Sequence, residues 1–85
     1  MQVKTKFQVR FNFLQTGEEK VVFVLVGESS DQKRKALVRA LEKLFGKGTG
    51  FTWTQSGVLS AFVGKFPDTS RIDNIKVTIN EVVGN

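Results

Sequence analysis

The sequence contains no cysteine, no histidine and no tyrosine. Without cysteine, neither disulfides nor thiolate metal sites can stabilise the chain. Without histidine, it lacks the commonest metal ligand and the usual general base near neutral pH. Of the eight Asp and Glu residues, most fall in expected turns, caps or helix flanks, and only Asp68 and Asp73 share a loop in which they could hold a cation. We therefore expect a non-enzymatic protein with no catalytic residues, no metal and no cofactor.

Long hydrophobic runs are also missing. The longest, residues 21–26 (VVFVLV), has the length of a strand and falls far short of the roughly 20 residues of a membrane helix. The N-terminal residues MQVKTKF lack the apolar segment of a secretory signal. We expect a cytoplasmic protein with no membrane partner.

The chain of 85 residues has the length of one small α+β domain, residues 1–85. A chain of this size buries roughly 60–65% of its unfolded surface, so eight Phe, one Trp and many Val must supply most of its core. The formal net charge is +5 and the pI is near 9.9, which favours anionic partners such as nucleic acid or acidic proteins.

Residues 3–13 alternate between two faces, one mostly apolar and one polar, which predicts a strand over about residues 3–14 with one buried face. The other face presents Lys4, Lys6 and Arg10, and no anion. Residues 15–20 (QTGEEK), with a glycine in a polar cluster, predict a hairpin turn. The following strand, residues 20–27, is apolar on both faces, which indicates cover on two sides or an exposed face that meets a partner.

A helix is predicted from about residue 30 to Phe45, with Ser29 or Ser30 as the N-cap and Gly46 as the stop. Its apolar residues share one arc at about 100° per residue. The basic residues spaced four apart share the opposite arc, where we expect a solvated outer face: Lys35, Arg39 and Lys43.

The C-terminal half predicts a second hairpin around residues 55–57, with arms over 51–54 and 58–66. A two-residue and a three-residue turn pair different residues, so the face taken by Trp53 stays open. Residues 68–74 predict a turn or one short helical turn, and residues 75–83 predict the last strand. The expected fold is therefore a two-layer α+β sandwich, a mostly antiparallel sheet of four to five strands with one amphipathic helix, in the order ββαβββ.

One helix leaves the second face of such a sheet open. The basic stripe of the first strand must then lie beside an apolar stripe of the second, and alternation allows two sets: Val21, Phe23 and Leu25, or Val22, Val24 and Val26. A mixed basic and apolar face is a poor surface to leave in water, so we expect a ligand or a partner to cover it.

Single-stranded nucleic acid combines phosphates, which attract Lys and Arg, with flat bases, which stack on aromatic side chains. We therefore predict a small nucleic-acid-binding module, with single strands favoured. Its predicted binding residues are Lys4, Lys6, Arg10, Phe51, Trp53 and Lys65. The alternative is a protein-interaction module, either a homo-oligomer such as a homodimer or a small inhibitor or adaptor that docks on a larger protein.

Overall fold

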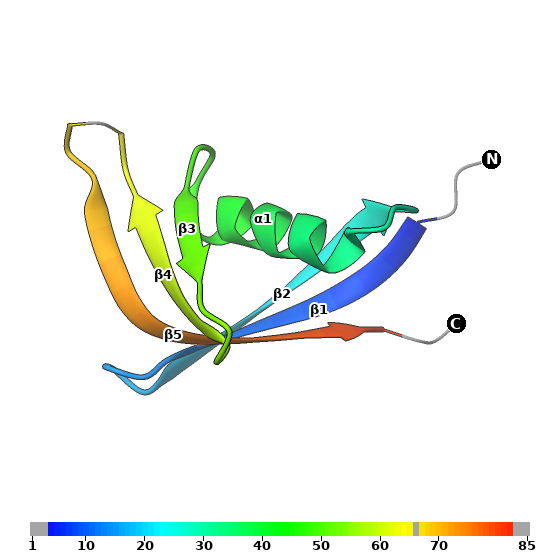
Figure 1. Cartoon of the computed structure of the whole chain (residues 1–85), viewed down its shortest axis with the longest axis horizontal. Helices are drawn as coiled ribbons and strands as arrows, with labels where there is room; N and C mark the ends of the chain where they lie inside the picture. Colours follow the sequence, from blue (N-terminus) through cyan, green and yellow to red (C-terminus); the bar gives the residue numbers. More distant parts are fainter. Residues whose placement is uncertain (1–3, 66, 83–85) are drawn as a thin grey trace.

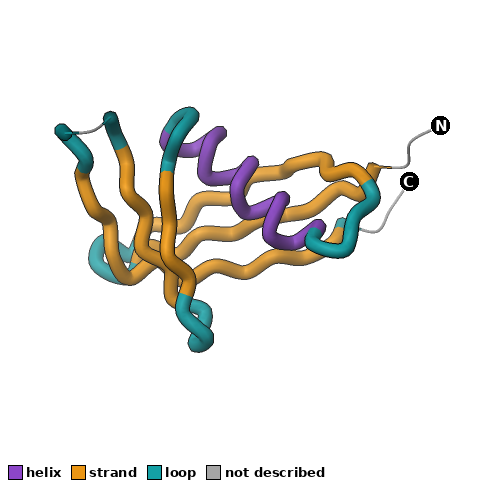
Figure 2. The backbone as a smooth tube through the Cα atoms, turned by 45° about the horizontal axis from the view of Figure 1, so that its top comes forward, coloured by secondary structure: helices purple, strands orange, loops and turns teal. Residues whose placement is uncertain are grey.

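A computed structural model of the chain describes residues 4–65 and 67–82. Within these residues, five strands form one antiparallel sheet in the order β2-β1-β5-β4-β3, and one helix lies on the concave side of the curved sheet (Figure 1, Figure 2). The elements are β1 (Lys4–Phe13), β2 (Glu18–Gly27), α1 (Gln32–Phe45), β3 (Gly50–Trp53), β4 (Val58–Val63) and β5 (Ser70–Glu81). The arrangement confirms the expected α+β class, sheet type and element order.

The core lies between the concave face of the sheet and α1. On β1 the odd-numbered residues Phe7, Val9 and Phe11 are buried, as the period of two predicts. Each large apolar side chain that is fully buried contributes about 1.5–3 kcal/mol relative to an exposed one. The buried residues of the other elements are Val24, Val26, Ala36, Leu37, Ala40, Leu41, Leu59, Ala61, Ile75 and Val77.

The first hairpin confirms the predicted turn, although β2 begins at Glu18, inside the segment expected to be the turn. Gly17 has φ +77° and donates its N–H to the carbonyl of Phe13 at 2.7 Å, which closes a loop of four residues, 14–17. This turn pairs Phe13 with Glu18 and Lys4 with Gly27. The predicted start of the first strand, residue 3, lies outside the described residues.

The helix ends as predicted but begins differently. Gly46, with φ +109°, follows Phe45 and donates its N–H to the carbonyl of Glu42 at 2.8 Å. At the other end Asp31 is the N-cap, so the prediction of Ser29 or Ser30 was wrong. The Ser29 hydroxyl accepts the N–H of Asp31 at 3.2 Å and donates to the Asp31 carboxylate. Ser29 therefore stabilises the turn before the helix rather than the first helical N–H groups.

The second hairpin has a three-residue connection. Thr54 donates its N–H to the carbonyl of Val58 at 2.9 Å, and Gly57, with φ +86°, donates to the carbonyl of Thr54 at 3.0 Å. This register places Trp53 opposite the buried Leu59, on the concave face that the helix occupies. The turn thus decides which face Trp53 takes, which the sequence left open.

The last strand is longer than predicted. β5 begins at Ser70, so the interpretation of residues 68–74 as a turn was wrong from residue 70 onward. Asn74 has φ +60°, and the pairing with β4 shifts between Leu59 and Ala61, which indicates a bulge. The polar segment 70–74 is extended because β4 pairs with it. The ends expected at residues 66 and 83 lie outside the described residues, and β4 itself ends at Val63.

Candidate functional site

The convex face of the sheet carries the predicted basic stripe beside an apolar one. In the β1–β2 register, Lys6 lies opposite Leu25, Gln8 opposite Phe23, and Arg10 opposite Val21. Of the two sets that the sequence allowed, the exposed one is therefore Val21, Phe23 and Leu25, with exposed fractions of 41%, 47% and 51%. The mixed face is confirmed, and Phe23 is its aromatic residue on β2.

Arg10 does not stand alone on this face. Its Nε lies 2.9 Å from a carboxylate oxygen of Glu19 on β2, and about half of each side chain is exposed. An ion pair this exposed contributes about 0–1 kcal/mol to stability, but it balances the charge of Arg10. Within the first strand no anion was visible, because the anion comes from the neighbouring strand.

Lys6 contacts the exposed aromatic ring directly. Its Nζ lies 5.1 Å from the centroid of the Phe23 ring. A cation over an aromatic face contributes about 0.5–1 kcal/mol at an exposed site. The contact holds a positive charge and a flat apolar surface together at one place on the sheet.

The outer edge of β2 is covered by side chains from α1. The carbonyls of Phe23, Leu25 and Gly27 accept hydrogen bonds from Lys43 Nζ (3.2 Å), Arg39 and Gln32 Nε2 (3.2 Å), in that order. Alternate residues of a strand direct their backbone groups to the same side, so these carbonyls point away from β1. Two members of the predicted solvated row thus contact β2, and only Lys35 keeps a local partner, Asp31, at 3.8 Å.

A groove of about 620 Å³ runs along this edge, and we call it the β2-edge groove. Its residues come from both layers: Lys6, Phe23, Val24, Leu25, Arg39, Glu42, Lys43 and Lys47. Four cations and one carboxylate leave three formal positive charges here, out of +5 for the whole chain. Ligand-binding clefts in proteins have volumes of about 300–1,000 Å³, so the groove is large enough for one nucleotide or a short segment of peptide.

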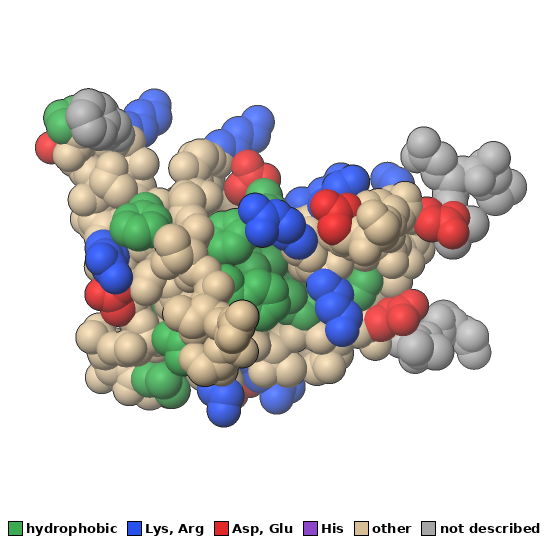
Figure 3. Space-filling view, viewed as in Figure 1, with side chains coloured by type: hydrophobic (Ala, Val, Ile, Leu, Met, Phe, Trp, Pro, Cys, Tyr) green, Lys and Arg blue, Asp and Glu red, His purple; other side chains and the backbone are tan. Residues whose placement is uncertain are grey.

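The predicted aromatic residues lie elsewhere. Phe51 and Trp53 are on β3, at the opposite edge of the sheet, and pair with the buried Ala61 and Leu59. Trp53 is 43% exposed, and Cζ of Arg34 lies 5.6 Å from the Phe51 ring centroid. In the space-filling view, hydrophobic side chains are visible between β3 and α1, with Lys and Arg around them (Figure 3).

The six predicted site residues therefore do not form one surface. Lys4, Lys6 and Arg10 share the convex face, Phe51 and Trp53 face the other way, and Lys65 lies in the loop after β4. Sequence reasoning missed Phe23, because its strand is apolar on both faces and alternation could not tell the exposed residues from the buried ones. It also missed the contacts of Arg39 and Lys43, which depend on how the helix lies against β2.

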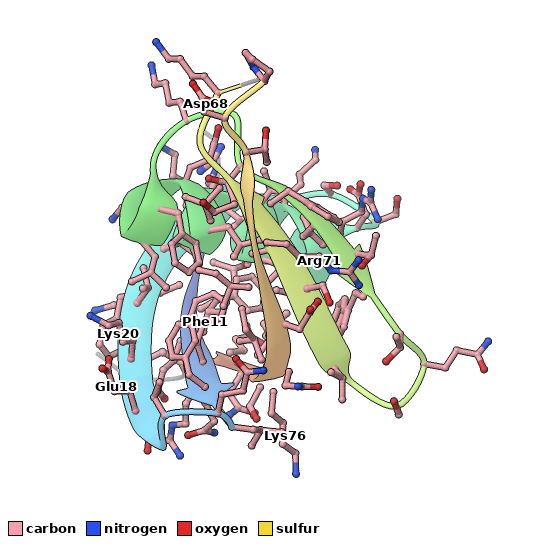
Figure 4. The ribbon with its side chains drawn as sticks, turned by 90° about the vertical axis from the view of Figure 1, so that its left-hand side faces the viewer. Phe11, Glu18, Lys20, Asp68, Arg71 and Lys76 are labelled. Carbon is pink, nitrogen blue, oxygen red and sulfur yellow. The ribbon has the colours of Figure 1, made fainter. Side chains whose placement is uncertain are left out.

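Asp68 and Asp73 are the two acidic residues that the sequence suggested for a cation, and one of them, Asp73, has a structural role. Asp73 accepts hydrogen bonds from Ser60 Oγ at 2.7 Å and Arg71 Nε at 2.6 Å. The bond from Ser60, followed by the contact with Arg71, lowers the pKa of the Asp73 carboxyl. Asp68 lies at the tip of the β4–β5 loop, whereas Arg71 lies further along β5 (Figure 4). The Asp73 carboxylate is therefore engaged by Ser60 and Arg71.

Residues 4–65 and 67–82 contain no group of three or more acidic side chains positioned to bind a metal ion. The helix found within the same ranges lacks the length and apolar character needed to cross a membrane. Comparison of the chain with protein-family models, with curated proteins and with solved structures finds no match. The β2-edge groove is therefore the candidate functional site of the described residues.

Proposed function

We propose that the protein is a non-enzymatic module that binds single-stranded nucleic acid in the β2-edge groove. The observation that carries the proposal is the position of Phe23, a half-exposed aromatic side chain in a groove with four cations and one carboxylate. Bases stack on aromatic side chains whatever their sequence, and phosphates attract Lys and Arg. A groove with both features suits a ligand with both.

The proposed contacts divide between two energetic terms. A base stacked on Phe23 contributes about 1–3 kcal/mol. Lys6 and Lys47 supply phosphate contacts, and each contact releases counterions and makes binding dependent on salt. Arg39 and Lys43 donate to neutral carbonyls of β2, which do not balance a positive charge, so both side chains add to the attraction for an anion.

The proposal changes part of the predicted residue set. Lys6 remains, because it lines the groove and contacts the Phe23 ring. Lys4 shares the convex face but lies opposite Gly27, at the end of β2, so it adds only its charge. The charge of Arg10 is balanced by Glu19, so its contribution is smaller. Phe51, Trp53 and Lys65 lie outside the groove, and we replace them with residues that line it: Phe23, Arg39, Lys43 and Lys47.

The first test measures the binding of a dye-labelled single-stranded oligonucleotide by fluorescence anisotropy over a range of salt concentrations. The variant Lys6→Ala/Lys47→Ala should bind more weakly, and its slope of log K against log salt should fall by about 1.4, about 0.7 for each lost phosphate contact. The matched control, Lys33→Ala/Lys35→Ala, removes two cations of α1 that do not line the groove. If both variants weaken oligonucleotide binding equally, binding depends on the overall charge of the protein and not on contacts in the groove.

A second test locates the base. Trp53 lies on the concave face, so the fluorescence of the natural chain should change little on binding. A tryptophan introduced as Phe23→Trp in a Trp53→Phe chain should be quenched by a stacked base. The opposite result would place the ligand at β3: the fluorescence of Trp53 would be quenched in the natural chain, and that of the tryptophan at position 23 would not change in the variant.

A protein partner is the second candidate, and the aliphatic side chains of Val21 and Leu25 favour it. Both are exposed beside Phe23, and an aliphatic side chain stacks on a base less well than an aromatic ring does. Poly-L-glutamate, an anion without bases, separates the two ligands. If it displaces the oligonucleotide at equal charge concentration, base contacts are absent and an acidic protein surface becomes the better candidate.

A further inference from the structure

The exposed apolar residues of β2 also carry the backbone groups that point outward from the edge of the sheet. The side chains of Phe23 and Leu25 lie on the convex face, and their carbonyls point away from β1. In a strand the N–H and the carbonyl of one residue point to the same side, so the N–H groups of Val21, Phe23 and Leu25 also point outward. An edge of this kind is a template for pairing with another strand.

A second copy of the same edge is a complementary partner for it. In an antiparallel register centred on Phe23, Val21 of each copy lies opposite Leu25 of the other, and the two Phe23 residues lie opposite each other. All of these residues direct their N–H and carbonyl groups outward, so each pair can exchange both hydrogen bonds. The exposed apolar stripes would then form one continuous patch and cover one another in part.

Two features of the groove oppose this pairing. Arg39 and Lys43 already donate to the carbonyls of Leu25 and Phe23, which a second strand would need. Pairing would also bring together four cations and one carboxylate from each copy, the charged residues of the groove. Natural proteins protect edge strands with charged side chains, and Lys is often used in this way.

We propose that the β2 edge is a latent homodimer interface, which Arg39 and Lys43 keep closed by covering its carbonyls and by repelling a like-charged copy. The same charges leave the groove open to an anion and closed to a second copy. This inference goes beyond the proposed nucleic-acid binding, and it is tested in the absence of any ligand, so either idea can fail without the other.

The test is the oligomeric state of Arg39→Ala/Lys43→Ala, measured by sedimentation equilibrium without nucleic acid. We expect a dimer Kd lower than that of the natural chain by about tenfold or more, because two carbonyls per copy are uncovered and two like charges are removed. The matched control is Lys33→Ala/Lys35→Ala, which removes equal charge from α1 and no bond to β2. A monomeric double variant, or equal dimerisation of the control, would overturn the proposal.

Pairing at the edge must also be distinguished from stacking of the convex faces. In the Arg39→Ala/Lys43→Ala chain, Val21→Pro removes an outward N–H that the dimer needs, whereas Val21→Ala keeps it. We expect the proline variant to return to a monomer and the alanine variant to remain a dimer. A proline variant that stays dimeric would contradict pairing through the edge.

Amide hydrogen exchange gives a readout that does not depend on a substitution in β2. In the natural chain the N–H groups of Phe23 and Leu25 should exchange much faster than that of Val24, which faces β1. In Arg39→Ala/Lys43→Ala the first two should become protected as the protein concentration rises, while Val24 stays protected throughout. Fast exchange of Phe23 and Leu25 at every concentration would rule out the dimer, and protection of Val24 confirms that the variant is folded.

Discussion

The two faces of β2 are made of the same kinds of residue and have opposite roles. Val24 and Val26 are buried under α1, whereas Phe23 and Leu25, their neighbours in sequence, are about half exposed on the convex face. Both sets are apolar, so hydrophobicity does not decide which set forms the core. Their surroundings decide it, because α1 covers one face and Lys6 with Gln8 borders the other. The exposed set, Val21, Phe23 and Leu25, is contiguous on one face, and a contiguous apolar patch is a candidate for binding.

The largest expected effect comes from placing the same charge on each face. Val24→Asp puts a carboxylate into the core, where it has no partner, and should leave the chain unfolded or nearly so. Phe23→Asp places the carboxylate beside Lys6 and should lower the free energy of unfolding by only about 1 kcal/mol. Urea denaturation followed by circular dichroism measures both. Similar losses for the two variants would mean that the faces differ less than their burial indicates.

The helix permits the same comparison at a smaller scale. Leu41 is buried, and Lys43, two residues further on, reaches the edge of β2. Leu41→Ala should lower the free energy of unfolding by about 2–5 kcal/mol, through lost burial and the cavity left behind. Lys43→Ala should change it by less than about 1 kcal/mol, because it removes a hydrogen bond to an exposed carbonyl. Chemical denaturation of the two variants under one set of conditions checks the ratio.

The ion pair between Arg10 and Glu19 on the convex face should contribute little to the free energy of unfolding. A double-mutant cycle on Arg10 and Glu19, with alanine at each position, should give a coupling energy of about 0–1 kcal/mol at low salt. The coupling should shrink further at high salt, because both side chains are exposed. A coupling well above this range would show that the convex face is covered in solution, for example by a second copy.

The smallest expected effect is on the stability of the protein at acidic pH. The Ser60 hydroxyl, followed by Arg71, lowers the pKa of Asp73 below its usual range. A carboxyl whose pKa is lowered by folding adds stability above its unfolded pKa and loses it as the pH falls through the folded one. Ser60→Ala should therefore reduce the difference in Tm between neutral and strongly acidic pH. Thermal unfolding of both chains checks this, and an unchanged difference would exclude the Ser60 bond as its source.

Much of the fold follows from short-range patterns, and the errors lie where those patterns are weak. The alternation of residues 4–13 and the amphipathic helix that ends at Gly46 are both confirmed. Segment 70–74 was expected to turn because it is polar, yet it is a strand because β4 pairs with it. Spacing predicts Ser29 or Ser30 as the N-cap, whereas the N-cap is Asp31, and the hydroxyl of Ser29 bonds to Asp31.

The candidate site was predicted only in part, and the same physical reason applies. A period of two or 3.6 depends on neighbours in sequence, so the basic face of β1 and the apolar arc of α1 are determined locally. The exposure of Phe23, the ion pair of Arg10 with Glu19 and the concave position of Trp53 depend on strand register. Register and helix docking are set by contacts between distant residues, and only the folded chain brings those residues together.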